Sequence, residues 1–167
     1  ANVKFLAFTG LAVSHDEARS FVRIGPSPVM DRSDEGLFFR AIHTVIYEDG
    51  ILKCWYGVGS KWSRINETEY PQYTTGYIES QDYMLFPKNG NVCLQFVNDE
   101  YRIGRPRVQK TNEGFRMYYT KGTLSGSDLP GYAESADGKS WQRMDENVGI
   151  SPSEHGWDSQ SLSYTAP

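Results

Sequence analysis

The amino-acid sequence predicts an all-β protein built from repeated units of antiparallel strands. Aromatic residues make up 14% of its 167 residues, and it also contains 16 Gly and 8 Pro. Aromatic and β-branched runs interrupted by Gly and Pro are typical of short strands joined by tight turns. The same Gly and Pro residues leave few windows long enough for a helix. Two interleaved sequence repeats make the prediction more specific.

The first repeat is a Gly, three strand-like residues and then Ser-x-Asp. It occurs three times, at residues 10–16 (GLAVSHD), 76–82 (GYIESQD) and 131–137 (GYAESAD). Ser and Asp side chains hydrogen-bond to nearby backbone groups in tight turns. We therefore expect each Ser-x-Asp to form a turn and its Asp to be structural. After the third copy, Trp141 is expected to pack back onto the strands.

The second repeat is a strand, a hairpin turn and another strand. It occurs at residues 40–56, with the turn Glu-Asp-Gly, and at residues 105–119, with the turn Asn-Glu-Gly. Asp-Gly and Glu-Gly between alternating runs favour hairpins. The repeat predicts that Arg40 and Arg105 occupy equivalent positions at the start of their strands.

The two repeats alternate along the chain, so together they describe one unit of about four strands in roughly 60 residues, typical of a β-propeller blade. We expect residues 38–100 and residues 101–148 to form one blade each. Residues 1–37 are then the late part of a preceding blade, and residues 149–167 begin a following one. The polar window at residues 61–70 is interpreted as a loop.

Composition and charge exclude several other classes of protein. A net charge of −4 argues against nucleic-acid binding, which needs a basic patch. No window of about 18 apolar residues predicts a membrane span, and no export signal is visible. The two cysteines, Cys54 and Cys93, lie in apolar runs and are expected to be buried free thiols, which favours a cytoplasmic location. The three His residues are dispersed, so neither a metal nor another cofactor is expected.

Several segments carry a resemblance to a known family. They are residues 31–35 (DRSDE) ahead of Phe39 and Arg40, residues 104–108 (GRPRV), residues 131–138 with Trp141, and residues 156–159 (GWDS). With these motifs the chain resembles the five-bladed β-propeller superfamily of glycoside hydrolases, of the family 43 and family 32 type. It is most similar to the uncharacterised glycosidase-like propellers of bacterial sugar-biosynthesis gene clusters.

The resemblance implies that the chain holds about two and a half blades of a five-bladed ring. An open propeller would expose unpaired strand edges. We therefore expect either that the chain is a fragment of a longer protein, or that a homodimer completes the ring. A different, smaller β fold is the third alternative.

In a propeller the innermost strands line the central pocket, so Arg40 and Arg105 are expected to bind the ligand there. Arginine presents five donors in a planar fork that suits carboxylates, phosphates and sugar hydroxyls. The alternative for each is an ion pair with a neighbouring carboxylate. The expected ligand is a sugar or a sugar conjugate.

The resemblance also implies catalytic carboxylates. Hydrolysis through an oxocarbenium-like transition state needs two of them flanking the glycosidic bond. Asp34 or Glu35, together with Asp158, is the predicted pair. The alternatives are a solvated turn for Asp34 and Glu35, and a cap or turn acceptor for Asp158.

Three further residues are predicted to contact the substrate: His43, His155 and Trp157. His43 follows Arg40 by three residues and so faces the opposite side of a regular strand, where a hydrogen-bonded core histidine is the alternative. Trp157 is a candidate for stacking on a sugar ring, or for structural packing. The leading hypothesis is a glycoside-hydrolase-like propeller that binds a sugar or sugar conjugate in its axial pocket, with hydrolysis of a glycosidic bond left open. The alternatives are a non-catalytic carbohydrate-binding propeller and a protein-interaction propeller.

Overall fold

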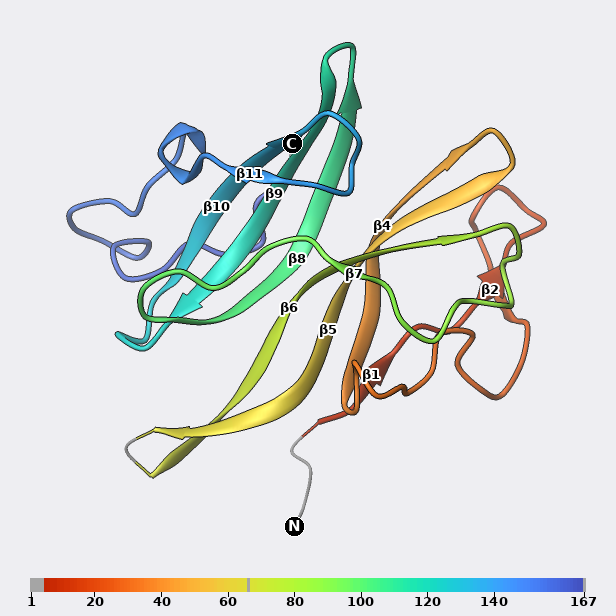
Figure 1. The fold of residues 1–167 in the computed structure, drawn as a ribbon, viewed down its shortest axis with the longest axis horizontal. Helices are drawn as coiled ribbons and strands as arrows, with labels where there is room; N and C mark the ends of the chain where they lie inside the picture. Colours follow the sequence, from red (N-terminus) through yellow and green to blue (C-terminus); the bar gives the residue numbers. More distant parts are fainter. Residues whose placement is uncertain (1–4, 66, 167) are drawn as a thin grey trace.

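The computed structural model describes residues 5–65 and 67–166, and it confirms the predicted all-β fold class. The described residues form eleven strands and a single 3-10 turn, Asp145–Asn147. Most of them belong to two four-stranded antiparallel units that lie side by side (Figure 1). Residues 1–4, part of the predicted first segment, and Pro167 lie outside the described residues.

The first blade consists of strands β4 to β7, in chain order. They are β4 (Phe39–Glu48), β5 (Ile51–Ile65), β6 (Thr68–Ser80) and β7 (Asn91–Val92). Each strand pairs antiparallel with the next. Short strands of the N-terminal segment lie beside this blade: β1 (Ala7–Phe8) pairs parallel with β4, while β2 (Ala12–Val13) and β3 (Val22–Arg23) pair with each other.

The second blade repeats this arrangement with β8 to β11. They are β8 (Glu100–Thr111), β9 (Gly114–Thr123), β10 (Asp128–Ser135) and β11 (Gln142–Arg143). The hairpins predicted at the Asp-Gly and Glu-Gly turns join β4 to β5 and β8 to β9. The blades meet at their inner strands, and one parallel pairing, Tyr73 with Arg102, joins β6 to β8.

The predicted loop at residues 61–70 is wrong. Apart from residue 66, which lies outside the described residues, this window forms the ends of β5 and β6, which extend the hairpin (Figure 1). Although this window is mostly polar, two of its aromatic side chains pack against aromatic rings elsewhere in the fold. The Trp62 ring lies 5.2 Å from that of Phe38, and the Tyr70 ring lies 4.9 Å from that of Tyr101. These contacts anchor the extended hairpin to Phe38 and to β8, and sequence periodicity does not reveal them.

The predicted Ser-x-Asp turns are confirmed. In each copy the Ser hydroxyl accepts a hydrogen bond from the backbone N–H of the Asp two residues later. In the third copy the Asp137 carboxylate also accepts from the backbone N–H groups of Lys139 and Ser140, both at 2.8 Å. These backbone hydrogen bonds hold the pKa of Asp137 below its ordinary value. The Asp residues therefore cap turns.

Two hydrophobic clusters cover the two faces of the first blade. Successive residues of β5 belong to different clusters, since successive side chains of a strand point to opposite faces. Trp55 belongs to the cluster between the blades, which includes Met117 and Tyr119 of β9. Tyr56 belongs to the cluster that Met30 of the N-terminal segment completes. Burial between blades is what holds the two units together.

The two cysteines are free, as predicted. Cys54 is buried in the cluster around Tyr56, whereas Cys93 packs against the cluster between the blades. Burial raises the pKa of the Cys54 thiol to about 11, so the thiol is protonated at neutral pH. No helix among the described residues is long and apolar enough to cross a membrane.

A single backbone carbonyl ties the third Ser-x-Asp turn to both blades. The carbonyl oxygen of Gly138 accepts hydrogen bonds from the indole N–H of Trp55, at 2.8 Å, and from that of Trp141, at 3.0 Å. Trp141 packs against the cluster between the blades, as predicted. Gly138 has a φ of +76°, so its backbone conformation favours glycine.

Gly138→Ala is expected to destabilise the protein more than Gly149→Ala. The φ values are +76° and +78°, so either alanine costs about 1–2 kcal/mol of backbone strain. Only at Gly138 does the added Cβ lie close to a side chain, 3.0 Å from Cζ2 of Trp55. Urea unfolding of both variants measures the difference. Equal losses of unfolding free energy would show that the space beside Trp55 accommodates the added methyl group.

Candidate functional site

A cavity of about 420 Å³ lies where the inner strands of the two blades meet. Its walls come from β4, β6 and β8 to β10, together with Phe5 and Tyr164 from the segments near the chain ends. The polar lining residues are His43, Arg102, Arg105, Thr120 and Asp128, and the ring-bearing ones are Phe5, Phe39, Tyr73 and Tyr164.

Two β-bulges shape this cavity. β4 is bulged between Ile42 and Thr44, and β8 between Gly104 and Arg107. Each bulge thus contains one lining residue, His43 in β4 and Arg105 in β8. Bulges are common next to binding sites because the extra residue re-aims a side chain.

Thr44 connects the two bulges directly. Its hydroxyl donates to the carbonyl of Pro106 at 2.8 Å and accepts from the backbone N–H of Val108 at 3.2 Å. The Arg107 guanidinium adds a second link, donating to the carbonyl of His43 at 3.0 Å. These contacts fix the spacing of the inner strands, and therefore the width of the cavity.

Arg105 projects from its bulge without an ion-pair partner among residues 5–65 and 67–166. Its backbone φ is +54°, a left-handed conformation that is rare for a residue other than glycine. Its guanidinium carbon lies 3.9 Å from the centre of the Tyr164 ring. The stacking holds the charged group at the cavity, in contact with solvent.

Arg102 and Asp128 form an ion pair across the cavity wall. The distance from Nη2 to Oδ1 is 2.6 Å, and both side chains are about three-quarters buried. The backbone of Asp128 is also tied to the C-terminal segment, because its N–H donates to the Ser161 hydroxyl and its carbonyl accepts from the N–H of Leu162, both at 2.8 Å. The segment expected to begin a new strand thus crosses β10 without forming a strand over residues 161–166.

His43 is neutral in this setting. Burial, together with the positive charges of Arg105 and Arg107, lowers the pKa of its imidazole to about 4. Its Nε2 atom is buried and has no hydrogen-bond partner among the described residues. A buried polar nitrogen without a hydrogen-bond partner costs free energy of folding.

Two of the residues predicted from the sequence, Arg105 and His43, therefore meet at the cavity. Arg40 points to the other face of β4, because it alternates with Phe39, Ala41 and His43. It is 3% exposed and donates to Glu35 at 3.1 Å, to the carbonyl of Asp31 at 2.8 Å and to that of Pro87 at 3.1 Å. These contacts match the alternative prediction for Arg40, an ion pair with a neighbouring carboxylate.

The predicted equivalence of Arg40 and Arg105 is wrong. Arg40 pairs with Val58 on the neighbouring strand, and the residue at the same distance from the second hairpin is Ile103, which pairs with Lys121. Arg105 therefore lies two residues further along its strand than the position equivalent to Arg40. A repeat aligned on residue type alone cannot detect such an offset.

The predicted carboxylates lie outside this cavity. Glu35 accepts hydrogen bonds from Arg40, from the Tyr56 hydroxyl at 2.7 Å and from the backbone N–H of Gly90 at 2.9 Å. Asp34 is exposed. Asp158 accepts a hydrogen bond from the Ser153 hydroxyl at 2.8 Å.

The remaining candidates lie near Asp158. His155 is exposed, and the Trp157 side chain is 95% exposed. The structure does not bring either of them to the cavity lining. Roles for Asp34, Glu35, Asp158, His155, Trp157 and Arg40 in binding or catalysis stay predictions.

The lining residues that sequence reasoning missed include Tyr73, Arg102, Asp128 and Tyr164. Arg102 had no signal, because a residue three positions before Arg105 faces the opposite side of a regular strand, and only the bulge after Gly104 brings both to the cavity. Asp128 follows the Ser-Gly-Ser turn at residues 125–127, which marks the start of β10. Tyr73 lies just beyond the window that was interpreted as a loop.

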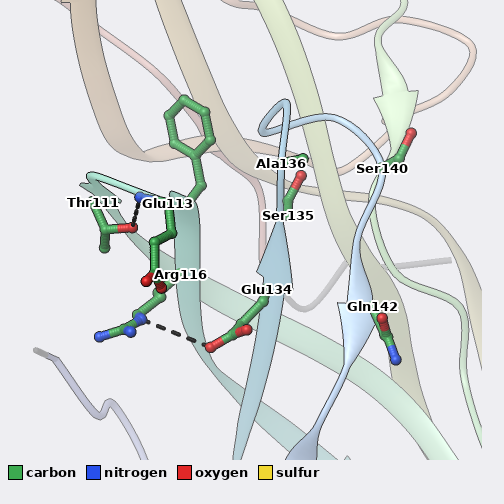
Figure 2. A pocket seen from close by; sticks show the side chains of 9 residues that line it. Thr111, Glu113, Arg116, Glu134, Ser135, Ala136, Ser140 and Gln142 are labelled. Carbon is green, nitrogen blue, oxygen red and sulfur yellow. Dashed lines mark hydrogen bonds and ion pairs between the residues drawn. The ribbon is translucent and has the colours of Figure 1, made fainter.

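A second hollow, of about 290 Å³, lies at the hairpin end of the second blade (Figure 2). Its charged groups are Glu113, Arg116 and Glu134, and the Arg116–Glu134 pair is 3.7 Å apart with both side chains 45% exposed. Ion pairs this exposed are well solvated and contribute little. Among the described residues, no group of three or more metal-ligating side chains is close enough to hold a metal ion, there or elsewhere.

Comparisons with known proteins agree on the fold. No protein-family model matches the sequence. The chain is 27% identical over 157 residues to the uncharacterized protein Rv1502 of Mycobacterium tuberculosis (strain ATCC 25618 / H37Rv), an alignment that covers 93% of this chain and 50% of the relative. The chain thus spans about half the length of the curated relatives it matches.

Solved structures extend this likeness. A protein described as a glycoside hydrolase superposes with a TM-score of 0.75 at 19% identity, over 97% of this chain and 49% of its own. A second structure, described as an RGII complex of BT0996, gives 0.75 at 20% identity, over 97% and 49%. The sucrose-6-phosphate hydrolase of Lactobacillus gasseri gives 0.55 at 16% identity, over 74% and 25%. The chain therefore shares its fold with parts of these three structures.

The His43 imidazole is expected to titrate near pH 4 rather than near its ordinary pKa of 6.5. Because the unfolded chain binds this proton first, the contribution of His43 to stability falls as the pH drops from 6.5 towards 4. Arg107→Gln should raise this pKa, because it removes a nearby positive charge, whereas Arg116→Gln should not. NMR titration of the ring protons measures all three. A midpoint near 6.5 in the wild type would contradict this account of the site.

Proposed function

We propose that the cavity between β4 and β8 is the carbohydrate-binding site of a glycoside-hydrolase-type propeller. The observation that carries this proposal is the pair of inner-strand bulges, which set His43 and Arg105 beside the rings of Tyr73 and Tyr164. Ligand sites combine apolar walls with a few convergent polar groups. Aromatic rings offer a flat surface for the face of a sugar, and the polar groups bond to its hydroxyls.

The structural neighbours support the same class of ligand. One is named a glycoside hydrolase and another a sucrose-6-phosphate hydrolase, which acts on a phosphorylated sugar. Fold alone does not determine function, so the proposal rests on the cavity and takes only the ligand class from the neighbours. We further propose that residues 38–100 and 101–148 act as two blades of a larger ring, completed by more of a longer chain or by a second copy.

Hydrolysis is the second candidate function. It needs two carboxylates about 5–10 Å apart across the bound sugar. Asp128 is the carboxylate that lines the cavity within the described residues, and Arg102 holds it at 2.6 Å. Asp34, Glu35 and Asp158, the carboxylates predicted from the sequence, lie outside the lining of this cavity. Simple binding needs no second carboxylate, and is therefore the function we put first.

Filling the cavity tests the proposal. Ala41 lines the cavity, so Ala41→Phe should abolish sugar binding by occupying the space of the ligand. Ala136 lines the hollow of Figure 2, and Ala136→Phe should leave binding unchanged. Saturation-transfer NMR against a panel of mono- and oligosaccharides measures binding, with circular dichroism as the control for folding.

Two results would count against the proposal. The first is that no sugar of the panel binds the wild type, and the second is that both variants bind equally well. The same mixtures test hydrolysis through released reducing sugar. Turnover that Asp128→Asn removes supports a glycosidase, and binding without turnover in the wild type assigns the cavity to binding alone.

A further inference from the structure

We propose that the cavity selects sugars that carry an acidic group, a carboxylate or a phosphate, and that Arg105 recognises this group. The inference rests on the proposed function and names its class of ligand.

The charge balance of the cavity is the first argument. Its lining contains two guanidinium groups, those of Arg102 and Arg105, and one carboxylate, that of Asp128. Arg102 is already neutralised by Asp128 at 2.6 Å. Arg105 is left as an uncompensated positive charge in the cavity, although the chain as a whole carries a net charge of −4. A cleft of one sign of charge concentrates ligands of the opposite sign.

The backbone at Arg105 is the second argument. A φ of +54° is unfavourable for a residue with a side chain, and Arg105 also precedes Pro106 in the sequence. A residue before proline is pushed toward extended conformations. Glycine or asparagine adopts a positive φ more easily. Strained residues of this kind cluster at ligand-binding sites, where the side chain is needed in a fixed direction.

The contacts of Arg105 fit an anion receptor. Tyr164 stacks on the guanidinium with 3.9 Å between its carbon and the ring centre. Stacking uses the flat face of the group and leaves its N–H edge free for bidentate binding of a carboxylate or phosphate. The neutral imidazole of His43 also lines the cavity and adds no charge of its own.

The nearest alternative is that the Arg105 side chain is structural. A structural arginine is expected to form an ion pair or to donate to backbone carbonyls, as the buried Arg40 does with Glu35, Asp31 and Pro87. Among residues 5–65 and 67–166, Arg105 has neither kind of contact with its N–H groups. Stacking on Tyr164 alone does not require a charge.

The test compares acidic and neutral sugars of the same stereochemistry. The probes are D-glucuronate against D-glucose, D-galacturonate against D-galactose, and D-glucose 6-phosphate as the phosphate arm. Dissociation constants come from NMR shift titrations at low salt. The acidic member of a pair should bind about tenfold more tightly than the neutral one, as expected for one added charge-assisted hydrogen-bond pair. Added salt should reduce this preference.

Arg105→Asn is the decisive variant, because asparagine accepts a positive φ and keeps the fold. It should bring the acidic sugar to within about twofold of its neutral partner while neutral-sugar binding persists. Arg105→Lys should restore part of the preference, since it keeps the charge but loses the fork. Arg116→Asn, at the hollow of Figure 2, makes the same charge change elsewhere and should have no effect.

The outcomes separate the two proposals. Equal binding of acidic and neutral sugars, or a preference that survives in Arg105→Asn, overturns this inference and leaves the carbohydrate site standing. Absence of binding to every probe, acidic and neutral, overturns the carbohydrate site and this inference with it. A preference for only the carboxylate or only the phosphate supports the inference and identifies which anion the cavity takes.

Discussion

The hydroxyl of Thr44 is the contact on which the geometry of the site depends. By donating to Pro106 and accepting from Val108, it fastens the bulge of β4 to the bulge of β8. Pro106 is fully buried and has no N–H to offer, so its carbonyl is its only backbone hydrogen-bonding group. These contacts hold the two inner strands together. The hydrophobic cluster that contains Trp55 packs between the blades, and the cavity lies beside the two bulges.

Much of the architecture was predictable because it follows from local chemistry. A Ser-x-Asp turn needs only its own side chains and the backbone next to it, and the three copies form as expected. The Asp-Gly and Glu-Gly hairpins are equally local. The hairpin at residues 61–70 was not predicted, because its aromatic residues pack against rings from distant parts of the chain, as Trp62 does against Phe38.

The site was only half predictable for a related reason. His43 was placed correctly on the face opposite Arg40, since strand alternation is a property of sequence. Arg105 lies two residues past the position equivalent to Arg40, an offset that the strand pairing reveals and a comparison of residue types does not. Asp128 and Tyr164 reach the cavity through the pairing of β10 and the path of the C-terminal segment, both of which depend on contacts between residues far apart in the chain. Glu35 was predicted to be a catalytic carboxylate, but in the structure its carboxylate accepts hydrogen bonds from Arg40 and Tyr56.

The central claim is that an acidic sugar binds between the blades at Arg105. A crystal structure of the protein soaked with a uronate tests it most directly. The account predicts the carboxylate within hydrogen-bonding distance of the Arg105 guanidinium, with the sugar ring against the aromatic lining of the cavity. Density for the sugar in the hollow of Figure 2, or beside Asp158 and Trp157, with the cavity left to solvent, would contradict it.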